Sequence, residues 1–189
     1  MKLHELQQLP MDKASRFKRA KVMGFDTSTV WLHGTGETDE YGDPIGSMHG
    51  SDDKSDTGHL ADLGTWFTES PEVADHFANR LGDYEYAQPQ VYPVFLKMKN
   101  PVMFDSYEDL ETEFVDFDGS APEFSNYLKG LGYDGIVVED SFTDVPVSRK
   151  DAVIFTPNQV RSIYAKFDET RAASGNISEA MEGLCFQYQ

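Results

Sequence analysis

The sequence TVWLHGTG, residues 29–36, joins a short β-prone run to a histidine and two glycines. Its β-branched and aromatic residues predict a strand over residues 28–32. His33 follows with a ring that can donate and accept hydrogen bonds, and Gly34 lets the backbone approach another group closely because it has no Cβ. These residues suit a binding cleft, but they also suit an ordinary loop, so the rest of the chain must decide between the two interpretations.

Length and composition bound the domain organisation. The chain has 189 residues, of which 39% are hydrophobic and 13% are aromatic. That is enough for one core and too little for two well-packed domains. We predict an N-terminal helical segment over residues 1–27, a main domain over 28–168 and a C-terminal tail over 169–189.

The charge balance limits the classes of partner. The 33 acidic residues outnumber the 16 basic ones and give a formal net charge of −17. A surface that binds duplex nucleic acid needs clustered Lys and Arg, so we expect a protein partner with a basic surface rather than a duplex. Residues 1–24 differ from the rest, with six basic and two acidic side chains. This segment either lies against the acidic body or forms a solvated helix face.

Cysteine usage and hydropathy bear on the compartment. Cys185 is the single cysteine, which excludes a disulfide framework within the chain and a cysteine-rich zinc site. The sequence has no apolar run near the ~18 residues of a membrane span and no early run of signal-peptide length. We therefore expect a cytoplasmic protein with no membrane partner.

The residue patterns predict an α+β fold. Apolar spacing and end signals favour a helix that stops at Gly24 and helices over residues 71–81, 107–116 and 122–131. Strands are favoured over 28–32, 65–67, 90–99, 134–140 and 152–155. We expect two small, packed, mainly antiparallel sheets with flanking helices. Residues 36–64 form a long loop rich in glycine and aspartate.

The glycines and histidines of the first half match no common phosphate or metal motif. Gly34 and Gly36 have the first spacing of the dinucleotide fingerprint, but Asp39 stands where its third glycine is needed. The sequence has neither a P-loop nor a G-x-S-x-G elbow. Because His49 and His59 follow no zinc-ligand spacing, we expect no metal.

Three separate blocks carry a resemblance to a known family: WLHGT (31–35), LGTWFTESPEVADHFA (63–78) and KDAVIFTPNQVRSIYAKFD (150–168). Together they resemble the ADP-ribosyltransferase fold, in its histidine-aromatic-acid branch. The family's aromatic pair lies eleven positions apart, as Trp66 and Phe77 do here, and its acid lies eight positions before a glutamine, as Asp151 and Gln159 do.

The resemblance extends over about residues 12–168 and is similar to phage-associated members of the polyvalent-protein type. It implies a transferase that uses NAD as co-substrate, modifies a protein acceptor with one ADP-ribose and releases nicotinamide. It also implies a phage protein in the host cytoplasm that acts on host or defence factors such as CRISPR components. An NAD glycohydrolase, or a non-catalytic acidic module that binds NAD, ADP-ribose or a protein, remains an alternative.

The resemblance also implies roles for residues that match the family's motifs. Asp151 would stabilise the oxocarbenium-like ribose that forms as the nicotinamide bond breaks. His33 would donate a hydrogen bond to the adenosine-side ribose and act with Asp151 in the active site. The backbone of Gly34 and the hydroxyl of Thr35 would hold the nicotinamide amide.

Aromatic residues would supply the surface for the nicotinamide ring. Trp66 and Phe77 are expected on either side of the ring, since aromatic faces attract a cationic pyridinium. Phe67 is also among the predicted cofactor-binding residues, although the core is the favoured place for its ring because neighbours in a strand face opposite ways. Thr68 and Gln159 complete the predicted cofactor-binding residues.

Two positions depart from the family pattern. Asp151 stands where most members carry glutamate, and Arg149, two residues earlier, replaces the acid or amide that arginine-modifying members use on their acceptor. The resemblance therefore favours neither an arginine acceptor nor a chain-extending polymerase. From its place at the start of a strand, Asp151 is expected to be exposed, so that its replacement by alanine costs less than ~0.5 kcal/mol of stability.

Overall fold

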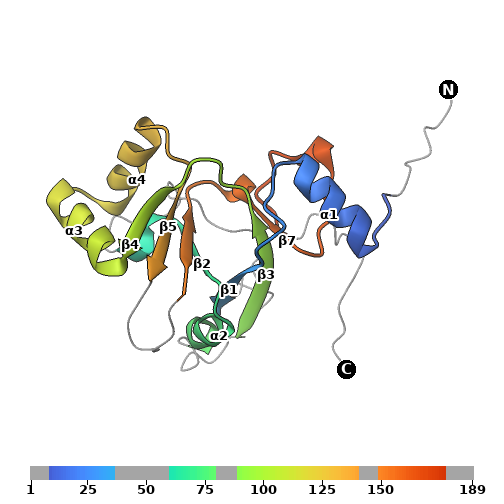
Figure 1. The fold of residues 1–189 in the computed structure, drawn as a ribbon, viewed down its shortest axis with the longest axis horizontal. Coiled ribbons are helices and arrows are strands. Elements are labelled where there is room, and N and C mark those ends of the chain that lie inside the picture. Colours follow the sequence, from blue (N-terminus) through green and yellow to red (C-terminus); the bar gives the residue numbers. More distant parts are fainter. Residues whose placement is uncertain (1–8, 37–59, 80–88, 141–148, 178–189) are drawn as a thin grey trace.

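The computed structural model describes residues 9–36, 60–79, 89–140 and 149–177 (Figure 1). Their elements in chain order are α1 (Lys13–Val22), β1 (Trp31–Thr35), η2 (Leu60–Leu63), β2 (Thr65–Thr68), α2 (Pro71–Asn79), β3 (Gln90–Leu96), β4 (Val102–Ser106), α3 (Tyr107–Phe117), α4 (Ala121–Gly130), β5 (Gly135–Asp140), β6 (Asp151–Ile154), η3 (Pro157–Gln159), β7 (Val160–Ser162) and η4 (Glu169–Arg171). The α+β class predicted from the sequence is confirmed.

The seven strands form one sheet in the order β4-β5-β6-β2-β1-β3-β7. Every neighbouring pair is antiparallel except β4 and β5. The expected division into two packed sheets is therefore not confirmed. The one sheet is nevertheless weakly joined in the middle. Strand β1 pairs with β3 over five residues but with β2 only through the pair Leu32 and Thr68. The sheet is thus two well-paired halves joined at one narrow junction.

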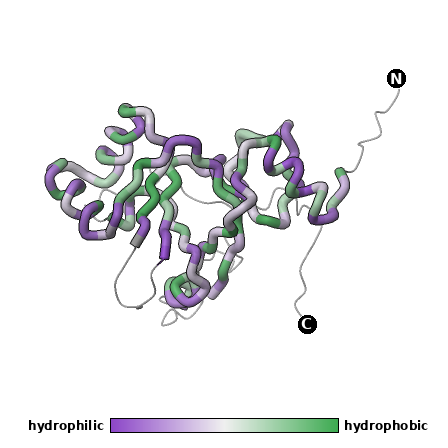
Figure 2. Tube along the Cα trace, viewed as in Figure 1, coloured by the Kyte–Doolittle hydropathy of each residue, from purple (hydrophilic) through white to green (hydrophobic). Residues whose placement is uncertain are grey.

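Each face of the sheet has its own core. Helices α3 and α4 lie together beside β4 and β5 (Figure 1), and their buried Leu110, Phe114 and Phe124 pack with Val153 of β6. The other face packs Phe67 of β2 with a separate cluster that includes Trp31, Val94 and Ile154. The strands are accordingly the most hydrophobic part of the trace (Figure 2).

The helix ends follow the signals in the sequence. Asp12 caps α1 by accepting from the backbone NH of Ser15, 3.0 Å away. Ser120 and Glu123 form a capping box at the start of α4, which satisfies backbone donors that the helix cannot pair itself. No helix in the described part of the chain is long and apolar enough to cross a membrane.

The N-terminal helix is bound to the body by apolar and backbone contacts. Ala20 of α1 is buried in a cluster with Phe95 of β3 and Phe167. Arg16 Nε donates to the Ile163 carbonyl at 3.3 Å, and Arg19 Nε donates to the Lys166 carbonyl at 2.6 Å. These arginines therefore bind α1 to backbone carbonyls of the segment that follows β7.

Two segments without a predicted element also enter the core. Leu60 and Leu63, at the end of the expected 36–64 loop, form η2 and are buried against the α3–α4 face. Ile177, in the expected C-terminal tail, is fully buried, and its carbonyl accepts from Ser162 N at 3.3 Å. Residues 37–59 of the loop, with His49 and His59, lie outside the described residues, as does Cys185.

Candidate active site

Several of the predicted site residues lie around the narrow junction of the sheet. Across β1, β2 and β6, the pairing aligns Leu32 with Thr68 and Thr68 with Asp151. Since neighbouring strands are about 4.8 Å apart, the Cα atoms of Leu32 and Asp151 are separated by about 10 Å. His33 follows Leu32 along β1, so the histidine, the hydroxyl of Thr68 and the carboxylate come from three adjacent strands. By strand alternation Thr68 and Asp151 lie on the face of Val153, whereas the His33 ring packs against Phe67 on the other face.

The imidazole of His33 bridges β1 and β2. Its Nδ1 lies 2.7 Å from the carbonyl oxygen of Trp66, and its ring centroid lies 5.5 Å from that of Phe67. A carbonyl oxygen only accepts, so Nδ1 must carry the proton, and Nε2 of the neutral ring is an acceptor. Nε2 is the nitrogen left to face a ligand, and the expected hydrogen bond from His33 to a ribose stays a prediction.

Asp151 is buried, contrary to the exposed position expected for it. The residue is 6% exposed, and its Oδ1 lies 3.4 Å from Nε of Arg149, which is also buried. The burial follows from its place in the sheet: β6 lies between β5 and β2, with Val138 and Thr68 directly opposite Asp151. Alternation along β6 puts Arg149 and Asp151 on the same face as Val153, which is the face that α3 and α4 cover.

The residue between them forms a separate ion pair at the rim. Lys150 Nζ lies 2.6 Å from Glu139 Oε2, and both side chains are partly exposed. The hydrogen bond to the Glu139 carboxylate raises the pKa of Lys150, and the charge of Glu69 adds to this effect. Lys150 is thus paired on the surface with Glu139, while Arg149 is the cation buried beside Asp151.

Gly34 has no room for a side chain because helix α2 lies directly against it. A Cβ at this position would lie 1.7 Å from the carbonyl oxygen of Ala74 and 3.0 Å from the backbone N of Ala78. Both atoms belong to α2, which therefore crosses β1 at a distance that only glycine permits. The close approach predicted from the sequence is real, but its partner is the α2 backbone; contact with a nicotinamide amide stays a prediction, as does the role of Thr35.

The aromatic residues divide between core and surface. Phe67 is 2% exposed, which confirms its expected place in the core. Trp66 faces the opposite core, where its Nε1 donates to the Leu60 carbonyl at 3.2 Å and its ring lies 6.3 Å from that of Tyr107. Phe77 lies on α2 and is 41% exposed. A ligand ring held between Trp66 and Phe77 stays a prediction.

Thr68 contributes to the turn that leads into α2. Its Oγ1 accepts from the backbone NH of Ser70 at 3.1 Å, and Ser70 in turn accepts from Val73 N at 3.4 Å. The hydroxyl that lies opposite Asp151 therefore also fixes the start of the helix that packs on Gly34. This connection links the geometry of the site to the position of α2.

Gln159 is not brought to the site. It lies beyond the other end of β6, is 7% exposed, and its side chain makes five hydrogen bonds to the protein. Its Oε1 accepts from Phe155 and Thr156, and its Nε2 donates to the carbonyls of Lys97 and Asp134. The amide thereby ties three chain segments together, which is a structural task distant from Asp151.

Replacing Gln159 by alanine is expected to lower the free energy of unfolding by about 2–4 kcal/mol, because several buried backbone groups lose their partner at once. Urea denaturation of the two proteins measures the difference. Asn158→Ala, on the exposed neighbouring side chain, is the matched control and is expected to change stability by less than about 0.5 kcal/mol. Equal effects of the two substitutions would contradict the structural role of Gln159.

Two residues beside the site were not assigned a role from the sequence. Arg149 was noted only as a departure, although its spacing of two from Asp151 on a strand is the signal that places both side chains on one face. Tyr107, whose ring lies near Trp66, is half-buried, and this burial, with the charge of Glu111, raises its pKa. No sequence signal pairs Tyr107 with Trp66, because their proximity depends on how α3 packs on β2.

Comparison with known proteins adds one match. A family described as ADP-ribosyltransferase in polyvalent proteins matches residues 29–170, more than half of the chain. No curated protein and no solved structure matches the chain. Among the described residues, no group of three or more His, Cys, Asp or Glu side chains is placed to hold a metal ion.

Proposed function

The chain belongs to the family of ADP-ribosyltransferases found in polyvalent proteins, and from that premise we propose that it transfers one ADP-ribose from NAD to a protein acceptor. The observation that carries the proposal is the buried carboxylate of Asp151 on the strand next to the His33–Trp66 bridge. In the proposed reaction the bond between ribose and nicotinamide breaks, and its electron pair leaves with the neutral base. A nucleophile of the acceptor forms the new bond to the ribose carbon and gives up its proton.

Asp151 supplies the negative charge that this reaction needs. Positive charge develops on the ribose as nicotinamide departs, and a fixed carboxylate in a water-poor site stabilises it more than an exposed one does. Arg149, with Nε 3.4 Å from Oδ1, restrains where that carboxylate lies. We infer that Arg149 is a positioning residue for Asp151.

His33 and the aromatic residues would orient the dinucleotide. With Nδ1 committed to the Trp66 carbonyl, Nε2 of neutral His33 can accept from a ribose hydroxyl. Phe77 has an exposed ring that can pack on the nicotinamide. The Trp66 ring packs in the α3–α4 cluster, on the face of the sheet away from the Phe67 ring that His33 contacts. Thr35, at the end of β1, would add a hydroxyl donor for the amide of the same ring.

The acceptor is proposed from charge. Arg149 occupies the position where arginine-modifying members activate their acceptor, and a guanidinium repels another guanidinium. With a net charge of −17, the chain favours an acceptor protein that has a basic surface. Host or defence factors, such as CRISPR components in a host cytoplasm, are the targets we propose.

Incubation of the full chain with NAD labelled in its adenylate part and a bacterial lysate tests the proposal. Transfer is expected to put the label on discrete protein bands and to release one nicotinamide for each ADP-ribose attached. Free ADP-ribose without labelled protein would instead show that water is the acceptor and that the chain is an NAD glycohydrolase. Unchanged NAD would contradict both activities and would favour a non-catalytic binding module.

A further inference from the structure

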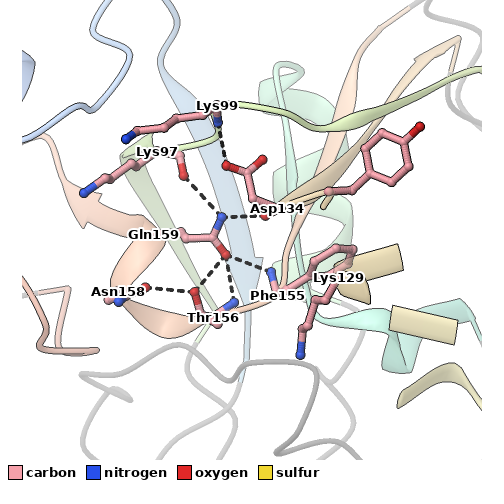
Figure 3. Close-up of a pocket in the computed structure, with 9 residues that line it drawn as sticks. Lys97, Lys99, Lys129, Asp134, Phe155, Thr156, Asn158 and Gln159 are labelled. Carbon is pink, nitrogen blue, oxygen red and sulfur yellow. Dashed lines mark hydrogen bonds between the residues drawn. The ribbon is translucent and has the colours of Figure 1, made fainter. Parts of the chain in front are cut away.

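A hollow lies at the end of β6 opposite to Asp151 (Figure 3). Its volume is about 280 Å³, and β6 lies between it and the candidate active site. The lining combines the chain after β3, the end of α4 with the turn that follows, and the connection from β6 to η3. The lining residues are Lys97, Lys99, Lys129, Tyr133, Asp134, Phe155, Thr156, Asn158 and Gln159.

Hydrogen bonds hold the wall of this pocket in place. Gln159 ties its three segments together through the five bonds described above. Asp134 adds a second tie, since its two carboxylate oxygens accept from the backbone NH groups of Lys99, at 2.6 Å, and Asn100, at 2.9 Å. A ligand would therefore meet a preformed wall rather than one that it must order.

The charge of the pocket is opposite to that of the protein. Three lysines line it, and its one carboxylate, on Asp134, already accepts two backbone NH groups. The side chains of Lys97 and Lys99 extend away from Gln159 on one side, and that of Lys129 extends away on the other side (Figure 3). A concave wall that carries one sign of charge concentrates the field and raises the local concentration of counter-ions.

Polar donors complete the lining. Asn158 adds a side-chain amide at the rim, with its Oδ1 2.8 Å from Thr156 Oγ1, and an amide NH2 group can donate to a ligand. Lys129 has its ammonium 5.8 Å from the centre of the Phe155 ring and 3.2 Å from Asn126 Oδ1. These contacts keep its charge close to the pocket wall.

We propose that this pocket binds a phosphate-bearing ligand at a site separate from that of NAD. Lysine ammonium groups are point charges that bind phosphate oxygens, and an amide NH2 can donate to a further oxygen. The volume lies at the lower end of the roughly 300–1,000 Å³ of pockets that enclose drug-sized ligands, which leaves room for a phosphate group and the small group that carries it. The proposal does not depend on the proposed transferase activity.

Titration of the full chain with inorganic phosphate, followed by amide NMR shifts, tests this site. Saturable shifts are expected at Lys99, Asn158 and Gln159, with a dissociation constant on the order of 1 mM. The double variant Lys99→Gln/Lys129→Gln is expected to bind about tenfold more weakly. A parallel titration with O-phosphoserine distinguishes the sources: tighter binding than inorganic phosphate indicates a phosphorylated protein, and equal binding indicates the free ion.

The matched control removes two lysines from another exposed surface. Lys13→Gln/Lys18→Gln on α1 changes the net charge equally and is expected to leave phosphate binding unchanged. Equal weakening by both double variants, or shifts that do not saturate, would overturn the proposal. Asp151→Asn is expected to bind phosphate normally, so a failure of this site and a failure of the transferase proposal give different results.

Discussion

Gly34→Ala is expected to destabilise the fold by about 3 kcal/mol or more. The added methyl group would meet the Ala74 carbonyl oxygen at 1.7 Å and the Ala78 backbone N at 3.0 Å. Both atoms are backbone, so no rotamer change relieves the overlap, and α2 must move away from β1. Urea denaturation followed by circular dichroism measures the loss.

Gly130→Ala provides the matched control. Gly130 ends α4, and a Cβ there would meet no atom within 4 Å. Because alanine restricts the unfolded chain without a clash, this variant is expected to be about 0.5–1 kcal/mol more stable than the parent. If Gly34→Ala instead retained full stability and lost only NAD binding, the glycine would serve the ligand and not the helix.

The sequence was most informative where structure depends on neighbouring residues. Ser70, Pro71 and the apolar spacing that follows predicted a helix over 71–81, and α2 spans Pro71–Asn79 in the described residues. The alternation around TWF predicted that Phe67 is core and that Trp66 faces the other way, and each packs in a different cluster. These features follow from local periodicity, which one chain is enough to reveal.

Local sequence patterns could not predict the features that depend on contacts between distant segments. The single pair of Leu32 with Thr68, which joins the strands into one sheet, depends on register between segments that a long loop separates. Gln159 matched a position of the family motif, but its hydrogen bonds to Lys97 and Asp134 join three segments that lie close together only in the folded protein. The sequence indicated that Gly34 allows close approach and could not show that α2 is what approaches.

The burial of Asp151 was predicted incorrectly for a related reason. At the start of a strand and after the polar residues SRK, an acid is expected at the surface. In the sheet, however, β6 has β5 on one side and β2 on the other, so its first residue is flanked by Val138 and Thr68. This position also changes how a test of its role must be designed.

Asp151→Asn is expected to reduce the rate of nicotinamide release from NAD by at least about a hundredfold, because the charge that stabilises the oxocarbenium-like ribose is removed. Asparagine keeps the shape of the side chain and an acceptor oxygen toward Arg149. Alanine is the poorer choice, because removing one member of a buried ion pair typically lowers the free energy of unfolding by about 3–5 kcal/mol. This larger cost supersedes the small one that the sequence predicted for an exposed acid. Steady-state kinetics and urea denaturation of the same preparation separate the rate effect from loss of fold.

Glu139→Gln is the control that makes this result specific. It removes a carboxylate from β5 that also pairs with a cation, Lys150, but that pair is partly exposed at the rim. An exposed ion pair contributes little to stability, so this variant is expected to unfold at the same urea concentration as the parent and to keep its rate within about twofold. Folded Asp151→Asn protein with an undiminished rate would remove Asp151 from the reaction. Equal losses in both variants would mean that the overall charge at this edge of the sheet matters, and not the one carboxylate held beside Arg149.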